Sequence, residues 1–397
     1  MYFTLCQAVL LEVFPQEQRG LAMGLSGVAA MFSLAGPFIG GYLTDNYSWQ
    51  WIFIMNIPLC MISFLLVKLF VPNDKPEKQK YNKKFDIIGY TSIVIAMACM
   101  QIVLDKGQQY NWFDTTWVCW TTGVCIFSFV FFYVWELEYK YPVIDIRVFK
   151  DRNFLFGTLI SSFINVMLYS TLLLVPMFVQ SLLGYSPSKS GLAMFPRAVI
   201  CLIGLLVVGE VSRYVKPKIL AATGLLLMAA SVLMLTQLNT TSSIEAVIIP
   251  NILLCIGVPT AFVPITALSF QTLPSSKNAD AAALHALFKN IITAMATAVS
   301  ATFIARVSQV RQTYLVEHLS PHNPVFQYKL MMLKSKFLIH YPTVLAAKKA
   351  SGTLYKELLQ QARLASFFDA FAVLALMCVT VIPLLLLIKA KKQDVSA

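Results

Sequence analysis

Charged residues are scarce in this 397-residue chain: Asp, Glu, Lys and Arg make up 13% of it, whereas hydrophobic residues make up 58%. An ordinary soluble domain carries about 25% charged residues. A chain this apolar cannot bury all of its hydrophobic surface in one water-soluble core. The composition therefore excludes a typical soluble protein and indicates a protein that crosses a membrane several times.

Motifs for nucleotide, metal and cofactor chemistry are also missing. The chain contains no GxxxxGKS or GxxxxGKT phosphate loop, no HExxH pair and no CxxC cluster. Its eight cysteines lie in apolar stretches without metal-ligand spacing, so we interpret them as small packing residues. We expect no metal site, no cofactor and no enzymatic activity, which disfavours an ATP-driven pump or a membrane enzyme.

The net charge of +12 does not indicate nucleic-acid binding. The basic residues lie between apolar runs and do not cluster with aromatic residues on a soluble surface, so the charge indicates contact with a membrane surface. The first apolar run lacks a basic start and a small-residue cleavage site, so it does not resemble a cleavable signal peptide.

Ten apolar stretches are long enough to cross a bilayer, which takes about 20 residues in a helix. They predict an all-α polytopic protein with spans near residues 20–43, 50–71, 87–105, 116–136, 154–182, 190–211, 217–237, 244–272, 280–305 and 365–388. Residues 1–14 are apolar too, but as a helix they would cover only about 21 Å of a core about 30 Å thick. We therefore expect a partial helix at the start and interpret the sequence as a fragment of a longer chain.

The basic residues of the short connections fall almost entirely on one side of this arrangement. When alternate connections are assigned to opposite sides, eighteen Lys and Arg lie on one side, and only Lys106 and Lys189 lie on the other. The positive-inside rule makes the first side cytoplasmic, together with the C-terminus. Nine further basic residues, between Arg306 and Arg363, fall on the outer side in a connection long enough to be largely exempt from the rule.

One stretch, LAGPFIGGYLTDNYSWQWIFIMNIP, carries a mechanical signal at its glycines and proline. Gly36 and Gly40 share a helix face in a small-xxx-small pattern, which lets another helix approach closely. Pro37 removes a backbone donor and is expected to bend the helix. With Gly41, these residues predict a bent and closely packed helix; an ordinary packing face is the alternative.

The whole run, GPxxGG followed by WxWIFxxNIP, resembles the fifth and sixth helices of the EmrB/QacA-type drug:proton antiporters, fourteen-span members of the major facilitator superfamily. FDIIGY, GYSPSKSGLAMFP and VPITALSFQTLP follow in the order that this family shows. The EmrB branch of Gram-negative inner membranes looks most similar. The resemblance implies a major facilitator fold, and an inner-membrane exporter that exchanges small amphipathic toxic compounds for protons by alternating access. It places Met1 within the fourth helix and the ten spans at the fifth to fourteenth.

The resemblance also implies a division of the chain. Residues 1–71 would be the remainder of an N-terminal helical bundle, 72–152 a linker with two extra transmembrane helices, and 153–397 a C-terminal six-helix bundle with an outer loop at 307–362. In EmrB-like systems a periplasmic adaptor and an outer-membrane channel complete the export path. The loop has helical patterning and is the candidate surface for the adaptor or for the membrane, with a self-packed cap as the favoured alternative.

Charged side chains inside apolar spans cost about 2.5 to 3.5 kcal/mol on insertion scales, so each is a candidate for the transport path. Asp369 could carry protons or simply face water near the outer interface. Lys289 could pair with a carboxylate or an anionic substrate group, or reach toward the cytoplasmic face. Arg197 could line a cavity, although we favour the outer surface. His285 lies one turn before Lys289, and a structural role is favoured there.

Polar residues within the spans could line a central pathway or form hydrogen bonds between helices. They are Asn165, Tyr169, Gln180, Asn251 and Asn290. Two alternatives to a multidrug exporter stay open: an inactive truncated remnant of such a transporter, and an exporter of another small molecule such as a metabolite.

Overall fold

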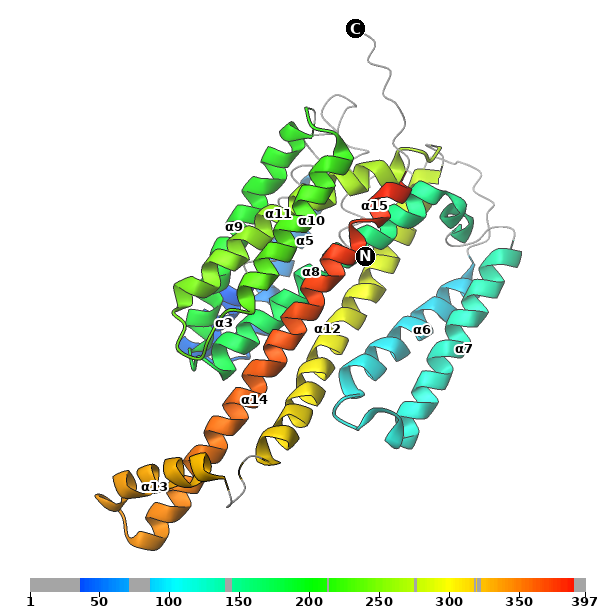
Figure 1. The fold of residues 1–397 in the computed structure, drawn as a ribbon. Helices are drawn as coiled ribbons and strands as arrows, with labels where there is room; N and C mark the ends of the chain where they lie inside the picture. Colours follow the sequence, from blue (N-terminus) through cyan, green and yellow to red (C-terminus); the bar gives the residue numbers. More distant parts are fainter. Residues whose placement is uncertain are drawn as a thin grey trace.

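The computed structural model describes residues 36–70, 86–139, 145–212, 214–274, 277–317, 319 and 323–388. Within these ranges the regular structure is entirely helical (Figure 1). Nine helical segments of the described chain are long and apolar enough to cross a membrane: Trp51–Leu69, Ile87–Lys106, Thr116–Glu138, Arg152–Ser181, Pro187–Val211, Pro217–Leu235, Ile244–Phe270, Asp280–Glu317 and Thr343–Leu387. The predicted all-α membrane fold is thus confirmed.

These nine segments correspond to nine of the ten expected spans. Of the remaining stretch, 20–43, only the last part is described, within α3 (Gly36–Asn46). The count of ten complete spans therefore stays a prediction. The expected partial helix at residues 1–14, the whole lysine-rich connection at 75–84, Arg213 and the C-terminal lysines also lie outside the described residues.

Helices α8 to α12 and α14 pack together into one bundle (Figure 1). Its members are α8 (Arg152–Ser181), α9 (Pro187–Val211), α10 (Pro217–Leu235), α11 (Ile244–Phe270), α12 (Asn278–Glu317) and α14 (Thr343–Val381), which the short α15 (Leu384–Leu387) follows. The core between them is aliphatic and aromatic. Phe178 of α8 packs edge-on against Phe367 of α14, with ring centroids 5.5 Å apart, and both side chains are almost fully buried.

Short polar residues cap the starts of α8 and α9. The Asp151 carboxylate accepts a hydrogen bond from the Phe154 backbone N–H at 2.9 Å, which satisfies an otherwise unpaired donor at the start of α8. Ser186 caps α9 in the same way, and Pro187 follows at the first helical position, where a missing N–H costs nothing. The chain therefore enters each of these helices where its sequence supplies a cap.

Helices α6 (Ile87–Lys106) and α7 (Thr116–Glu138) form a hairpin at the side of the bundle, joined through η3 (Trp112–Asp114) (Figure 1). Asp86 caps α6 by accepting from the Gly89 N–H and also accepts from the Trp135 indole of α7, each at 2.9 Å. The two helices pack mainly against each other, α6 touching α12 and α7 touching η4 (Ile146–Lys150). Their outward side chains, such as Trp120 and Phe127, are exposed and apolar, as contact with lipid requires.

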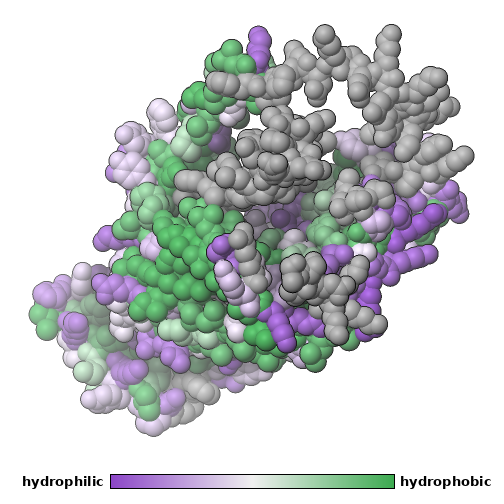
Figure 2. Space-filling model, turned by 90° about the horizontal axis from the view of Figure 1, so that it is seen from above, coloured by the Kyte–Doolittle hydropathy of each residue, from purple (hydrophilic) through white to green (hydrophobic). Residues whose placement is uncertain are grey.

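Hydrophobic side chains cover broad areas of the molecular surface (Figure 2). On α9 they include Ile203, Leu206 and Val207, each more than half exposed. A water-soluble protein rarely exposes apolar patches of this extent. The surface therefore agrees with burial in a bilayer.

The region expected as an outer loop is helical over most of its length. Helix α12 runs without a break to Glu317, beyond the apolar run that ends near residue 305, and α14 begins at Thr343, well before the predicted span at 365. The apolar run ends where charged residues begin. The helix itself continues, because no Gly or Pro interrupts residues 278–317. The predicted spans 280–305 and 365–388 therefore lie within longer helices.

We call residues 306–317 of α12, α13 (Pro324–Leu338) and residues 343–364 of α14 the helical arm (Figure 1). Helix α13 packs on α14, and the Gln312 side chain of α12 donates a hydrogen bond to the Tyr355 hydroxyl of α14 at 2.7 Å. The arm is therefore packed on itself. This agrees with the favoured alternative for the outer loop, a self-packed cap.

Candidate functional site

The glycine-rich helix α3 lies against the first turns of α9 with the two backbones in close contact. A Cβ added at Gly41 would clash with the Pro187 carbonyl oxygen, and a Cβ added at Gly191 would clash with the carbonyl oxygen of Pro37. One glycine on each helix therefore permits the contact, as in other close helix crossings of membrane proteins.

The close contact uses a different face of α3 from the one that the spacing predicted. A Cβ at Gly36 would meet none of the described residues within 4 Å, and one at Gly40 would meet only the Ile52 side chain, at 3.8 Å. Among the described residues the close contact is made at Gly41, and a close packing role for the Gly36 and Gly40 face stays a prediction. Gly41 is rotated by about 100° from Gly40, and this neighbouring face meets α9.

The end of α3 also binds the start of α9 through polar groups. The Asp45 carboxylate accepts the Ser188 backbone N–H at 2.7 Å, and the Ser188 hydroxyl donates to the Gly41 carbonyl at 3.2 Å. Hydrogen bonds from the Ser188 side chain and then from its backbone lower the pKa of Asp45. An acidic group is well placed here because the first N–H groups of a helix have no partner within the helix and carry partial positive charge.

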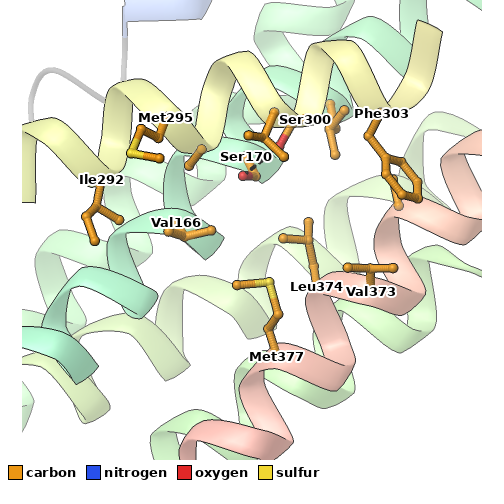
Figure 3. Close-up of a pocket in the computed structure, with 13 residues that line it drawn as sticks. Val166, Ser170, Ile292, Met295, Ser300, Phe303, Val373, Leu374 and Met377 are labelled. Atoms are coloured by element: carbon orange, nitrogen blue, oxygen red, sulfur yellow. Dashed lines mark hydrogen bonds between the residues drawn. The ribbon is translucent and has the colours of Figure 1, made fainter. Parts of the chain in front are cut away.

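A cavity of about 250 Å³ lies between α8, α12 and α14 (Figure 3). Its walls are apolar apart from two serines, and the side chains recur every three or four residues along each helix. The lining residues are Val166, Ser170 and Leu174 of α8; Ile292, Met295, Ala296, Val299, Ser300 and Phe303 of α12; and Ala370, Val373, Leu374 and Met377 of α14. A mostly apolar cavity with a few polar groups is the usual form of a small-molecule site.

The two serines are the polar groups of this cavity. The Ser300 hydroxyl of α12 donates to the Ser170 hydroxyl of α8 at 2.9 Å, and both residues are buried (Figure 3). Hydroxyl groups both donate and accept, so either serine can turn toward a bound ligand if the pair separates. The sequence analysis missed both residues, although the apolar stripe on α12 was a signal that could have directed attention to Ser300.

Lys289 and His285 lie on α12, on the cytoplasmic side of the cavity in the predicted topology. Lys289 precedes Ala296 by seven residues and so shares its helix face. It is mostly buried and forms no ion pair within the described part of the chain. The His285 Nδ1 atom lies 3.3 Å from the Thr158 hydroxyl, and its Nε2 atom is buried without a partner among the described residues.

Asp369 lies at the opposite end of the cavity, one residue before the lining residue Ala370. Its carboxylate forms an ion pair with the Arg311 guanidinium of α12, whose Nη2 and Nε atoms lie 2.8 and 3.2 Å from Oδ2. Both side chains are partly exposed. The pair links α12 to α14 where the arm begins, and Arg311 was not anticipated because it lies in the expected loop.

Arg197 does not reach the surface, which corrects the preferred prediction for it. The side chain has no exposed area and lies between α8, α9 and α11. It donates to the Leu168 carbonyl at 2.8 Å and to the Thr171 hydroxyl at 3.1 Å, and it lies 3.5 Å from the Asn251 side-chain oxygen. It lies near the middle of α9, where the neighbouring helices cover it.

The remaining polar candidates do not form one lining. Asn165 is buried and donates to the Ser161 carbonyl of its own helix at 2.8 Å, which supports a structural role. Tyr169 packs on the bundle core, and Asn290 is exposed. The structure thus places Asp369 next to a lining residue of the cavity and Lys289 on the same face of α12 as the lining residue Ala296, whereas Arg197 lies between other helices.

A bundle of long apolar helices with sparse embedded charges and an apolar cavity between three of them defines a polytopic helical membrane protein. The profile of the Major Facilitator Superfamily matches residues 1–297 of the chain. The chain belongs to this superfamily.

Three relatives illustrate the similarity within the superfamily. The chain is 28% identical over 329 residues to the probable multidrug resistance protein EmrY of Escherichia coli (strain K12), covering 81% of this chain and 63% of EmrY. It is 26% identical over 325 residues to the multidrug export protein EmrB of Haemophilus influenzae, with 81% and 63% covered. It is 25% identical over 369 residues to EmrB of Escherichia coli (strain K12), with 92% and 70% covered.

The similarity confirms the predicted resemblance to EmrB-like transporters. The chain spans 63% of the length of EmrY and of the Haemophilus influenzae EmrB. A crystal structure of a bacterial homologue of the human lysosomal transporter Spinster, in an inward-facing and occupied conformation, matches with a TM-score of 0.51 at 13% identity, covering 96% of this chain and 72% of that one. This match supports the fold alone.

Proposed function

We propose that the protein is a multidrug exporter that moves small amphipathic compounds across a membrane in exchange for protons. The observation that carries the proposal is the apolar cavity between α8, α12 and α14, with its paired serines. Relatives named as multidrug export proteins support it. The activity is transport and not an enzymatic reaction.

The composition of the cavity suits varied apolar ligands. Met295 and Met377 are flexible and polarizable, so they adapt to ligands of different shape. Promiscuous binding surfaces often use methionine for this reason. Phe303 adds an aromatic face, and the serines offer hydrogen bonds to the polar end of an amphipathic compound.

Transport would proceed by alternating access, in which two helical bundles rock about a central site. The contact between α3 and α9 joins a helix of the expected first bundle to a helix of the second. Its backbone packing at Gly41 and Gly191 is the part that must open or tilt when the access side changes.

Proton exchange would use Asp369, the carboxylate beside the cavity. Protonation would remove its charge and release Arg311, thereby loosening α12 from α14 at the arm. Lys289, without an acidic partner among the described residues, would attract an anionic group of a substrate or a carboxylate elsewhere in the protein.

The location would be the bacterial inner membrane, with the C-terminus in the cytoplasm and the arm on the outer side. There the arm would meet a periplasmic adaptor protein that leads to an outer-membrane channel. Exposed apolar side chains on α13, such as Tyr328, Met331 and Met332, support a protein partner, because water-exposed apolar patches often mark docking surfaces.

An efflux measurement tests the proposal. The natural gene product is expressed in a bacterial host that lacks its own pumps, and dye efflux is followed before and after the proton gradient is collapsed. We expect efflux that stops on collapse. An Ala296→Phe variant, which fills the cavity, should reduce efflux at least several-fold, whereas Ala301→Phe on an exposed position of the same helix should not. The proposal would be contradicted if efflux persisted after the proton gradient is collapsed and was unchanged in the Ala296→Phe variant.

A further inference from the structure

A second polar cluster lies inside the bundle between α9 and α11, away from the cavity. Each helix contributes two residues one turn apart: Arg197 and Cys201 on α9, and Asn251 and Cys255 on α11. The Arg197 Nη1 atom lies 3.5 Å from the Asn251 oxygen, and the Cys201 and Cys255 thiols are in hydrogen-bonding contact. All four side chains are essentially without exposed area.

The two backbones approach closely where the thiols meet. A Cβ added at Gly204 of α9 would clash with the Pro259 ring of α11 and would lie 3.5 Å from the Cys255 carbonyl oxygen. Glycine at position 204 therefore allows α9 and α11 to pack closely. This pair could not be predicted from the sequence, because Cys201 and Cys255 are 54 residues apart in the chain.

Arg197 carries a permanent positive charge without an acidic partner among the described residues. Its hydrogen-bond partners are neutral: the Leu168 carbonyl, the Thr171 hydroxyl and the Asn251 amide. Its Nε atom is buried with no partner in the described structure, and the side chain also contacts the Cys255 thiol. A buried charge without compensation is strongly unfavourable, so a negative group is expected beside it.

We propose that Cys201 and Cys255 form a two-coordinate binding site for a soft monovalent cation, Cu⁺ or Ag⁺. Thiolates are the preferred ligands of such ions, and a bound thiol must lose its proton. One cation and two thiols give a bis-thiolate complex with a single negative charge and two released protons, without any change of oxidation state. That single negative charge neutralises Arg197.

The charge balance and the ligand count disfavour other metals. The described residues contain no group of three or more His, Cys, Asp or Glu side chains that could hold a metal. Structural zinc is almost always held by four ligands, and calcium and magnesium prefer oxygen. A divalent ion held by two thiolates would be neutral and would leave Arg197 uncompensated, whereas two ligands suffice for a soft monovalent ion.

A titration with silver ions tests the site. The full chain is purified in detergent with a non-thiol reductant, and silver binding and proton release are measured together by calorimetry in buffers of different ionisation enthalpy. The background variant has serine at the other six cysteines and keeps Cys201 and Cys255. We expect one tightly bound silver ion and two released protons per chain.

Substitutions assign the binding to the pair. Adding Cys201→Ser or Cys255→Ser to the background variant should weaken silver binding at least a hundredfold. In the wild-type chain, Cys378→Ser, at a buried cysteine elsewhere in the bundle, should leave this high-affinity site intact. Arg197→Gln should weaken binding at least tenfold, and Arg197→Lys should restore most of it, which separates a charge effect from a packing effect.

Three results would overturn the proposal. They are a folded background variant that binds no silver after reduction, release of one proton per ion, and equal affinity with and without Cys201. Folding of each variant is checked by its helical circular dichroism and thermal melt. A disulfide between the two thiols that persists under the reductant would appear as a mass lower by two hydrogen atoms, and it too would contradict an ion-binding role.

Discussion

Arg311 and Asp369 form an ion pair across two helices at the arm end of the apolar cavity, with Nη2 and Oδ2 2.8 Å apart. Arg311 belongs to the part of α12 that extends beyond the apolar run, and Asp369 lies on α14 beside the lining residue Ala370. The ion pair therefore gives Asp369 a defined partner. It also connects the helical arm to the cavity.

Replacing Asp369 separates a transport role from a structural one. Asp369→Asn removes the ion pair but should change stability by only about 0 to 1 kcal/mol, because both side chains are partly exposed. If the carboxylate carries protons, the pH dependence of efflux should flatten in this variant. Glu317→Gln, at the end of α12, is the control, and an unchanged pH profile in Asp369→Asn would end the candidacy of this residue.

Adding a single methyl group at Gly191 should destabilise the protein. Gly191→Ala places a methyl group against the Pro37 backbone, which cannot move aside as a flexible side chain would. We expect a loss of about 1 to 3 kcal/mol in stability. Gly209→Ala on the same helix is the matched control, because a Cβ there meets nothing within 4 Å of the described structure. Equal melting temperatures for the two variants would show that α3 and α9 do not pack in this way.

The contact between Asp45 and Ser188 should depend on pH only in acid. The hydrogen bonds from Ser188 lower the folded-state pKa of Asp45 below its ordinary value of 3.8. A carboxyl group with a lowered pKa contributes its stabilisation fully above the unfolded-state pKa and loses it as the pH falls through the folded-state value. The difference in melting temperature between wild type and Asp45→Asn should be constant near neutral pH and should shrink below about pH 4. A difference that instead changes between pH 6 and 8 would assign the effect to another group.

Packing within the helical arm can be measured with two leucines of α14. Leu354 is buried at 7% exposure and Leu345 is 44% exposed. Leu354→Ala should cost about 2 to 4 kcal/mol, whereas Leu345→Ala should change stability by about 0.5 kcal/mol or less. Hydrogen exchange of the arm checks the prediction, and the same protection in both variants would argue against a packed arm.

Hydropathy predicted most of the membrane helices because the length of an apolar run is set directly by the thickness of the bilayer. It did not predict the ends of α12 and α14, since the transition from lipid to water changes the side chains and leaves the backbone helical. Residues after Arg306 are charged but favour helix, and only the structure shows that the helix continues to Glu317.

The site was less predictable than the fold. Embedded charge selected Lys289 and Asp369 as candidate positions, but it could not say which cavity they would adjoin. Arg197 was misplaced because exposure depends on how α8 and α11 cover α9, and sequence spacing carries no information on that packing. Ser170 and Ser300 were missed because a serine in a span is common and only the pairing across helices distinguishes these two.

Helix α12 is 40 residues long, which corresponds to about 60 Å of continuous helix, twice the thickness of a bilayer core. The same rod forms a wall of the cavity and one side of the arm. A tilt caused by a ligand inside the membrane would be carried along this rod as a much larger displacement at its far end. The length of α12 would therefore make movement at the end of the arm larger than movement at the cavity wall.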